Sequence, residues 1–433
     1  MKNSVKVLFF LFVVVFILKS HTLLLAQESQ SSPLRLSDLI EKALKSNPDV
    51  LAAKSKWEVL KERPAQAGSL DDPVLGLAII NLPTDTFSFR QEDMTMKEIS
   101  LNQRFLFPGK RGLRSEMAQR EAEAAYSDYE EIKARVARDV KTAYYELYYV
   151  NKAIEVTEKN REVLKLLSQL AETKYSVGEG IHTDVFKSQV ELFKMIDELI
   201  MLNQTKRSLK VRINTLLLQP AFAPLGDPEE VPFEKFSSSE EDLLKRAAEN
   251  RPLLQSANRM IERNKISLKI AEKEYYPDFD VKLAYGQRDE GPTGRRADMI
   301  TAMVGFNIPV WHKSKQARKV AESQKDIQSA RDQLAAMTNE IRFTIGEKLT
   351  TIERAEKQLE LLKTGIIPQA TFSLDSAISS YRVNKVDFIT MLDNLMTLFK
   401  YEIQYYRLVS EHRKNIAEIE AAVGKSSGEE KRG

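Results

Sequence analysis

The sequence contains two copies of one pattern, set about 205 residues apart, and this repeat limits the possible folds more than any other feature. The stretch SDLIEKALKSNPDVLAA at residues 37–53 recurs as EDLLKRAAENRPLLQSA at residues 241–257. Residues 175–194, YSVGEGIHTDVFKSQVELFK, align without a gap to residues 381–400, YRVNKVDFITMLDNLMTLFK. Two further matches fall between these in the same order, 72–79 with 276–285 and 101–118 with 304–321. Matches in one order throughout the chain indicate a duplication.

Each copy reads as helix, strand, loop, strand, very long helix, turn and long helix. Apolar residues at spacings of three and four predict the very long helices at about 109–177 and 312–380, and their return helices at about 182–217 and 387–423. A helix of about 69 residues is roughly 100 Å long. Helices of this length, with stripes rich in alanine, valine, leucine and tyrosine, are expected to pack lengthwise in coiled-coil-like pairs.

The motif FPGKR joins a strand to the first very long helix. Before it, Ile99, Leu101 and Phe105 alternate with polar residues, which is the period of a strand with one apolar face. Pro108 and Gly109 end that strand, because proline cannot donate a hydrogen bond to a sheet and glycine permits a turn. A phosphate-binding loop would need glycine at position 104 and Ser or Thr at position 111, and both positions hold arginine. We therefore interpret the motif as a strand-to-helix junction.

Four strands are predicted in two hairpins, 74–81 with 97–107 and 278–287 with 298–310. Strands of about ten residues suit an outer-membrane β-barrel. A soluble hairpin with a half-buried face is the alternative, but no other strand-rich region is present for it to pack against. Aromatic residues at the inner strand ends would form the girdle at the membrane surface: Phe105, Phe107 and Trp311.

Four strands cannot close a barrel, because even the smallest barrels need about eight. Several copies of the chain must therefore contribute: two copies would give eight strands and three would give twelve. A wide pore that continues into a helical tube favours the larger number. The expected fold is mainly α-helical with a transmembrane β-barrel, built from two-repeat protomers.

The N-terminus has the features of a secretory signal. Lys2 and Lys6 precede the apolar run 7–18, which is too short to span a bilayer as a helix, and we expect cleavage after Ala26. The chain contains no cysteine, so a lipid anchor is not expected. We divide the chain into a signal peptide, a first repeat, a second repeat and a polar tail, at 1–26, 27–235, 236–424 and 425–433.

The charge balance argues against nucleic acid as a partner. The chain has 65 Lys and Arg against 62 Asp and Glu, and the excess comes from the lysines of the signal, which holds no acid. The exported chain is therefore electrically balanced. After residue 26 no apolar run is long enough for a transmembrane helix, so entry into a membrane would have to use the strands.

Taken together, the signal, the duplicated helix-and-proline opening, the strand-to-helix junctions and the motif YSVGEGIHTDV resemble TolC-type outer-membrane efflux channels. The resemblance covers residues from about 35 to 423, and the FPGKR junction is similar to the cation-efflux branch of that family. It implies a homotrimer with a twelve-stranded barrel in the outer membrane and a helical barrel across the periplasm. It also implies docking to an inner-membrane pump, of the RND type, through a periplasmic membrane-fusion adaptor.

In channels of this family, the periplasmic helix tips close the pore with aspartates and a tyrosine-centred network. The resemblance places Asp184 in the first tip and Tyr381 at the start of the second. Asp393 occupies one pore-acid position, and Thr390 stands where another acid is often found. The usual basic partner after the tyrosine is absent, so Arg382 is the candidate substitute.

The function we predict is a passive conduit that carries small molecules or metal ions from a pump to the exterior. The alternative is a periplasmic coiled-coil adaptor or scaffold, but an adaptor would carry glycine-rich β-domains flanking a single hairpin, and this chain has two equivalent halves. An enzyme is not expected, and neither is a cofactor. With four histidines and no cysteine, a His/Cys metal site is not expected. Met94 and Met96 could touch a soft metal ion, but an ordinary role in a loop is the simpler interpretation.

Overall fold

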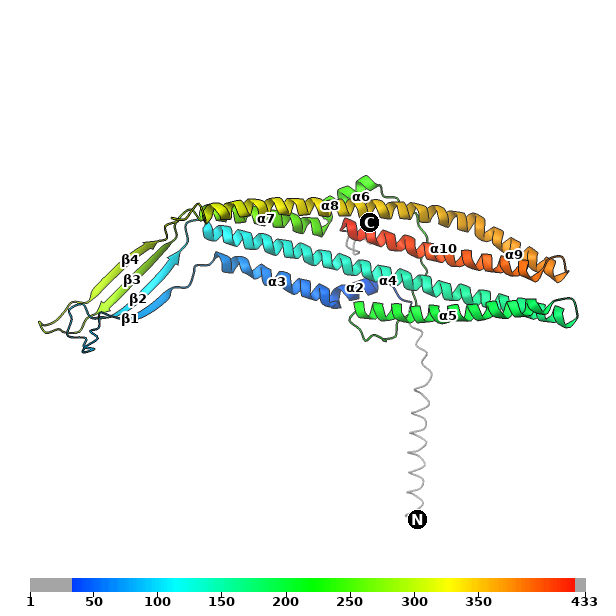
Figure 1. Cartoon of the computed structure of the whole chain (residues 1–433), viewed down its shortest axis with the longest axis horizontal. Coiled ribbons are helices and arrows are strands. Elements are labelled where there is room, and N and C mark those ends of the chain that lie inside the picture. The colour runs from blue at the N-terminus through cyan, green and yellow to red at the C-terminus, as the bar shows by residue number, and fades with distance from the viewer. Residues whose placement is uncertain (1–32, 425–433) are drawn as a thin grey trace, which may run out of the picture.

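The computed structural model describes residues 33–424, so the predicted signal peptide and polar tail lie outside the described residues. The protomer is strongly elongated, with its strands at one end and helices along the rest of its length (Figure 1). Between residues 33 and 424, none of the helices is both long enough and apolar enough to cross a lipid bilayer.

The two repeats have the same order of elements. The first consists of α2 (Leu36–Ser46), α3 (Pro48–Gly68), β1 (Val74–Ile80), β2 (Met96–Phe105), α4 (Lys110–Ser176) and α5 (His182–Leu216). The second consists of α6 (Glu240–Asn250), α7 (Pro252–Lys273), β3 (Phe279–Gln287), β4 (Met299–Phe306), α8 (Gln316–Leu361), the π-helical turn η1 (Leu362–Ile366), α9 (Ile367–Arg382) and α10 (Phe388–Val423). The duplicated order predicted from the sequence is thus present in the fold.

Proline starts the second helix of each repeat. Pro48 and Pro252 occupy the first turns of α3 and α7, where the N–H that proline lacks has no partner within the helix. The residues before them are extended, which separates α2 from α3 and α6 from α7.

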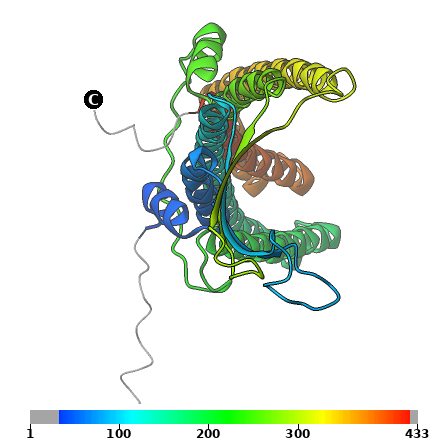
Figure 2. The same cartoon turned by 90° about the vertical axis from the view of Figure 1, so that its left-hand side faces the viewer.

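The long helices form a curved wall. Viewed from the strand end, the wall forms an arc, and α2 and α6 lie on its convex side (Figure 2). Helix α4 contacts α3, α7, α5 and α10, and so lies at the centre of the wall. Its small buried residues Ala118, Ala122 and Ala125 allow the neighbouring helices to approach closely along a 67-residue helix. The core is therefore a set of clusters along the molecule and not one compact centre.

The strands form one antiparallel sheet in the order β1-β2-β3-β4. Leu101 of β2 pairs with Leu75 of β1 and with Leu283 of β3, so the two repeats meet along β2 and β3. Because side chains alternate across a strand, these leucines share one face of the sheet, and all three are exposed. On the other face, Glu98 and Lys282 form an ion pair with 2.7 Å between Oε1 and Nζ. The sheet thus has an apolar face and a polar face.

Two strand ends differ from the prediction by more than one residue. Strand β4 ends at Phe306 and not at residue 310, although the alternation of apolar residues continues to Val310. Phe306 pairs with Phe279, the first residue of β3, so the residues beyond it have no strand to pair with, and Pro309 could not donate to one. Strand β2 ends at Phe105 for the same reason, two residues before the predicted end.

The second very long helix is not continuous from 312 to 380 as predicted. It begins at Gln316, after a turn in which the Trp311 carbonyl accepts from the N–H of Lys315 at 3.0 Å. Further on, the π-helical turn at Leu362–Ile366 separates α8 from α9. Pro368 explains this second break, because it cannot donate to the carbonyl four residues earlier and its ring clashes with that carbonyl. By contrast, α4 is unbroken between the predicted bounds, to within a residue at each end.

Candidate channel gate and strand-to-helix junctions

Each helical hairpin ends in a turn that needs a left-handed residue. Gly178 has φ of 80° between α4 and α5, and Asn384 has φ of 59° between α9 and α10. Glycine reaches this conformation without cost, and asparagine reaches it more readily than most residues. The sequence predicted both turns at these positions.

Lys174 joins the two helix tips. Its ammonium group donates to the Asn384 side-chain carbonyl and lies 3.6 Å from the Glu179 carboxylate. It also lies over the ring of Tyr381, 5.3 Å from the ring centre. The lysine side chain is only 7% exposed, so this positive charge is held between the hairpins. Sequence analysis missed Lys174, because Asn384 and Tyr381 lie in the other repeat.

Tyr381 is buried between the helices of the second tip. Its ring packs edge-on against Phe388, with 5.7 Å between ring centres, and belongs to an apolar cluster that includes Val185 of the first tip. Burial and, to a smaller extent, the charge of Asp184 raise the pKa of the Tyr381 hydroxyl. Within residues 33–424, no hydrogen bond joins this hydroxyl to Asp184.

Asp184 lies half-buried in the first turn of α5, close to a second carboxylate. Burial, and then the negative charge of Asp387, raise the pKa of Asp184. Asp387 caps α10 by accepting from the backbone N–H of Thr390 at 2.9 Å. The tip therefore brings Asp184, Asp387, Tyr381 and Thr390 together. Asp393 and Arg382 are exposed on the surface of the single chain.

The first strand-to-helix junction has the conformation that its sequence predicts. Gly109 has φ of 88°, which a residue with a Cβ would rarely adopt. Phe107 stacks on Tyr276, with 4.6 Å between ring centres and 16° between ring planes. At the second junction Trp311 is 76% exposed, so the two junctions are not equivalent in a single chain.

A buried ion pair fixes the first junction to the second repeat. The Lys110 ammonium donates to Oδ1 of Asp278 at 2.8 Å and to the Tyr276 carbonyl at 2.9 Å. The same carboxylate oxygen accepts from the backbone N–H of Phe107 at 2.9 Å. The side chains of Lys110 and Asp278 are 5% and 10% exposed. Asp278 was not singled out in the sequence, where only its place just before a strand distinguishes it.

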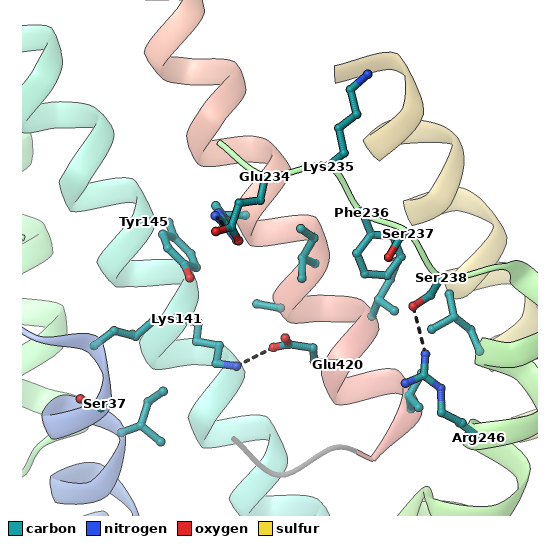
Figure 3. A pocket seen from close by; sticks show the side chains of 18 residues that line it. Ser37, Lys141, Tyr145, Glu234, Lys235, Phe236, Ser237, Ser238, Arg246 and Glu420 are labelled. Carbon is teal, nitrogen blue, oxygen red and sulfur yellow. Dashed lines mark hydrogen bonds and ion pairs between the residues drawn. The ribbon is translucent and has the colours of Figure 1, made fainter. Parts of the chain in front are cut away.

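A cleft of about 600 Å³ opens where α2, α4, α6 and α10 meet the segment that links the repeats (Figure 3). Lys141 of α4 and Glu420 of α10 form an ion pair of 2.5 Å across it, which joins the first repeat to the second. Arg246 donates to the Ser238 hydroxyl at 3.2 Å and so holds the linking segment against α6. Both interactions join segments of the chain that are distant in sequence or in different elements, which indicates a structural role.

The described part of the chain, residues 33–424, contains no group of three or more His, Asp or Glu side chains placed to hold a metal ion. His182 lies between the rings of Tyr175 and Phe186. His412 is buried and bonds through Nε2 to Glu356 at 3.1 Å, and burial lowers the pKa of its imidazole. His182 therefore packs against aromatic rings and His412 is hydrogen-bonded to Glu356, which gives both a structural role.

The model of the outer membrane efflux protein family matches residues 39–217, which hold most of the first repeat. The chain therefore resembles the outer membrane efflux protein family over its first repeat. A relative spanning both repeats is the cobalt-zinc-cadmium resistance protein CzcC of Cupriavidus metallidurans, which is 22% identical over 402 residues and 91% of each chain.

Solved structures share the fold of the protomer. The outer membrane protein VceC of Vibrio cholerae superposes with a TM-score of 0.76 at 18% identity, over 90% of this chain and 96% of that chain. CusC superposes with a TM-score of 0.72 at 13% identity, over 92% and 93%. The protomer therefore has the TolC-type fold predicted from its sequence.

Proposed function

We propose that three copies of this chain assemble into an export channel, with a twelve-stranded barrel in the outer membrane and a helical tunnel across the periplasm. The observation that carries this proposal is the sheet. Within residues 33–424, strands β1 and β4 each pair on one side only, so both edges are available to other copies. Antiparallel edges of this kind close into a barrel with an even number of strands.

The two faces of the sheet support a membrane setting. Residues on one face are apolar and exposed in the single chain, and exposure of so large an apolar surface to water is unfavourable. They include Leu75, Leu77, Ile99, Leu101, Leu283, Ile300, Val304 and Phe306. The opposite face carries Ser100, Asn102 and the Glu98–Lys282 pair, which suits a water-filled pore.

The proposed partners are a periplasmic membrane-fusion adaptor and an inner-membrane pump of the RND type. The hairpin tips lie at the end of the molecule opposite the sheet, which is where a periplasmic partner could reach them (Figure 1). The proposed cargo is a metal ion or another small molecule. The printed name of CzcC, a cobalt-zinc-cadmium resistance protein, favours divalent metal ions as the cargo.

The tips form the proposed gate. Asp184, Tyr381 and Thr390 lie together there, and Asp393 would give a ring of three carboxylates in a trimer, which favours cations over anions. Arg382 is the proposed basic partner, and as an exposed residue it is available to a neighbouring protomer.

Conductance in a planar bilayer tests both the channel and its gate. The double variant Tyr381→Phe with Asp184→Ala should raise the resting current, and Asp393→Asn should lower cation selectivity. Asp128→Asn, an exposed carboxylate in the strand-proximal half of α4, is the control for a charge change away from the tips. A protein that forms no pores contradicts the channel, and wild-type current and selectivity in all tip variants contradict the gate.

A further inference from the structure

A groove opens on the helical wall close to the sheet. It has a volume of about 480 Å³, and α3, α4, α7 and α8, which pack side by side in that order, all contribute to its lining. Arg114 lines it from the second turn of α4, about 6 Å along the helix from the end that follows β2. The groove therefore lies just beyond the strands, where the two longest described helices begin.

The groove opens on the convex side of the wall. Ala118 lines it, and Ala122, one turn further along the same face of α4, lines the next groove along the wall. That next groove is also lined by Ala248 and Glu249 of α6, which lies on the convex side (Figure 2). In a ring of protomers that encloses a tunnel, the convex side faces outward. The groove therefore faces the surroundings of the channel at the level where the strands end.

The lining combines basic and apolar side chains. Arg63, Arg114 and Lys319 contribute three positive charges, against one negative charge from Glu274. The apolar part of the lining consists of Ala67, Met117, Ala118, Ile270 and Ala271. A groove of this composition fits an amphiphile that has an anionic head next to an apolar part.

Arg114 is the cation that is free to bind such a ligand. Arg63 and Lys319 already pair with Glu121 and Glu322, at 3.3 and 3.0 Å. The exposed guanidinium of Arg114, by contrast, has no hydrogen bond or ion pair to any residue between 33 and 424.

Unpaired positive charge extends beyond Arg114. In the described part of the chain, the side chains of Arg111 and Lys315 are also exposed and without a hydrogen bond or ion pair. The first turns of α4 and α8 contain no acid, although the N-terminus of a helix favours negative charge. Two exposed acids at this end of the molecule, Asp71 and Asp72, precede edge strand β1 and pair with none of these cations. An anion beside Arg114 would offset this charge.

The groove lies at the level where lipid headgroups would meet the protein. The exposed apolar face of the sheet reaches Phe306, the last residue of β4, and Trp311 beyond it is 76% exposed. Exposed tryptophans of this kind are typical of the membrane–water interface. The headgroup layer is about 5–8 Å thick on each side of a bilayer, so a cation about 6 Å along α4 is within its reach.

We propose that this groove binds the phosphate headgroup of an anionic phospholipid from the leaflet that faces the helices. The guanidinium of Arg114 donates two parallel hydrogen bonds to the phosphate oxygens, as this group commonly does. The apolar lining contacts the glycerol and the first carbons of the acyl chains. Placing a membrane at this level rests on the proposed channel function.

Native mass spectrometry of the full-length protein in a neutral detergent measures lipid binding directly. Dioctanoyl phosphatidylglycerol should bind more tightly than phosphatidylcholine with the same acyl chains, whose headgroup has no net charge. Arg114→Gln should weaken binding of phosphatidylglycerol about five-fold, the contribution of one basic residue near an anionic lipid surface, and leave phosphatidylcholine unaffected. Arg114→Lys should restore most of the loss. The matched control is Arg354→Gln, which changes an exposed, unpaired arginine about 50 Å further along α8.

Three outcomes would overturn the proposal. Equal affinity for the two lipids, in a protein that still conducts ions, contradicts the lipid site and leaves the channel standing. Equal binding of phosphatidylglycerol by Arg114→Gln and the wild type contradicts the groove as its location. Displacement of phosphatidylglycerol by inorganic phosphate at equal concentration means that the groove takes free phosphate and not lipid. A protein that forms no pores but keeps the Arg114-dependent preference contradicts the channel and supports the lipid site.

Discussion

At the first strand-to-helix junction, an ammonium group and a carboxylate lie 2.8 Å apart with little access to water. Asp278 accepts from Lys110 and from the Phe107 backbone, so one carboxylate sets the position of β2, β3 and the start of α4. Removing one partner of a buried pair is costly, because the other charge stays buried without compensation. The stability of the junction should therefore depend strongly on Lys110.

We expect Lys110→Met to lower the free energy of unfolding by about 3 kcal/mol, as measured by denaturant titration in lipid vesicles. Lys319→Met breaks an exposed pair with Glu322, and this control should change stability by less than about 0.5 kcal/mol. The double variant Lys110→Met with Asp278→Leu should recover part of the loss, because no buried charge is then left unpaired; Arg104, which also pairs with Asp278, is 53% exposed. Equal effects of Lys110→Met and Lys319→Met would contradict the role of burial.

The paired carboxylates of the tip make its stability depend on pH. Burial and then the charge of Asp387 raise the pKa of Asp184 above the value of about 3.9 expected in the unfolded chain. Between the two pKa values, Asp184 binds more protons in the folded tip than in the unfolded chain. The contribution of Asp184 to the free energy of unfolding should therefore fall as pH rises through this window.

Asp184→Asn should remove this pH dependence, because the amide does not titrate. Hydrogen exchange of the α4–α5 tip, followed from below pH 4 to neutral pH, measures the effect. The wild-type tip should lose protection relative to the variant as pH rises. Parallel pH profiles for the two proteins would contradict the prediction.

At the scale of single residues, sequence could predict conformations but not partners. The left-handed turns at Gly109, Gly178 and Asn384 follow from residue type and position, which are local properties. Lys110 and Asp278 are 168 residues apart, and each looks like an ordinary surface charge in its own segment. Contacts between the repeats arise only from tertiary packing, and one sequence contains no direct record of them.

At the scale of elements, helical periodicity located the long helices, but it did not predict two boundaries, the end of β4 and the break between α8 and α9. The alternation that predicted a strand to residue 310 is real, yet β4 ends at Phe306 because β3 offers nothing to pair with beyond Phe279. The proline at 368 was visible, but a proline within a helical pattern can end, kink or locally unwind the helix. The structure shows local unwinding, in the form of a π-helical turn.

Strand β4 allows the membrane face to be tested with neighbouring residues. Val304 and Met303 are similarly exposed in the single chain, at 55% and 52%, but they lie on opposite faces of the sheet. Val304→Asp should impair assembly, because a carboxylate facing lipid costs somewhat less than the about 2–4 kcal/mol measured for Lys or Arg at mid-membrane. Met303→Asp should assemble nearly normally, since that face would meet water. Trimer yield on native gels distinguishes them, and equal yields would mean that neither face contacts lipid.

For the whole molecule, the number of copies is the property that one chain cannot reveal. The protomer supplies four strands, and both eight and twelve strands give closed barrels. What distinguishes them is the curvature of the helical wall and the angle between protomers, which depend on contacts between copies. The prediction of three copies therefore needs a measurement that counts chains and identifies the joined edges.

Disulfide crosslinking can do both, because the chain has no cysteine of its own. We expect Leu77→Cys on β1, combined in turn with cysteine at Ile300, Ala302 or Val304 on β4, to link neighbouring protomers at the one register where the Cα atoms lie within about 7 Å. Under oxidation, the best pair should produce covalent dimers and trimers and nothing larger, since a closed ring has three joints. Leu101→Cys on β2 with Ala302→Cys is the control, because both neighbours of β2 belong to its own chain. A product series that stops at two chains would indicate an eight-stranded barrel, and a folded monomer without crosslinks in mild detergent would remove the basis for a shared barrel altogether.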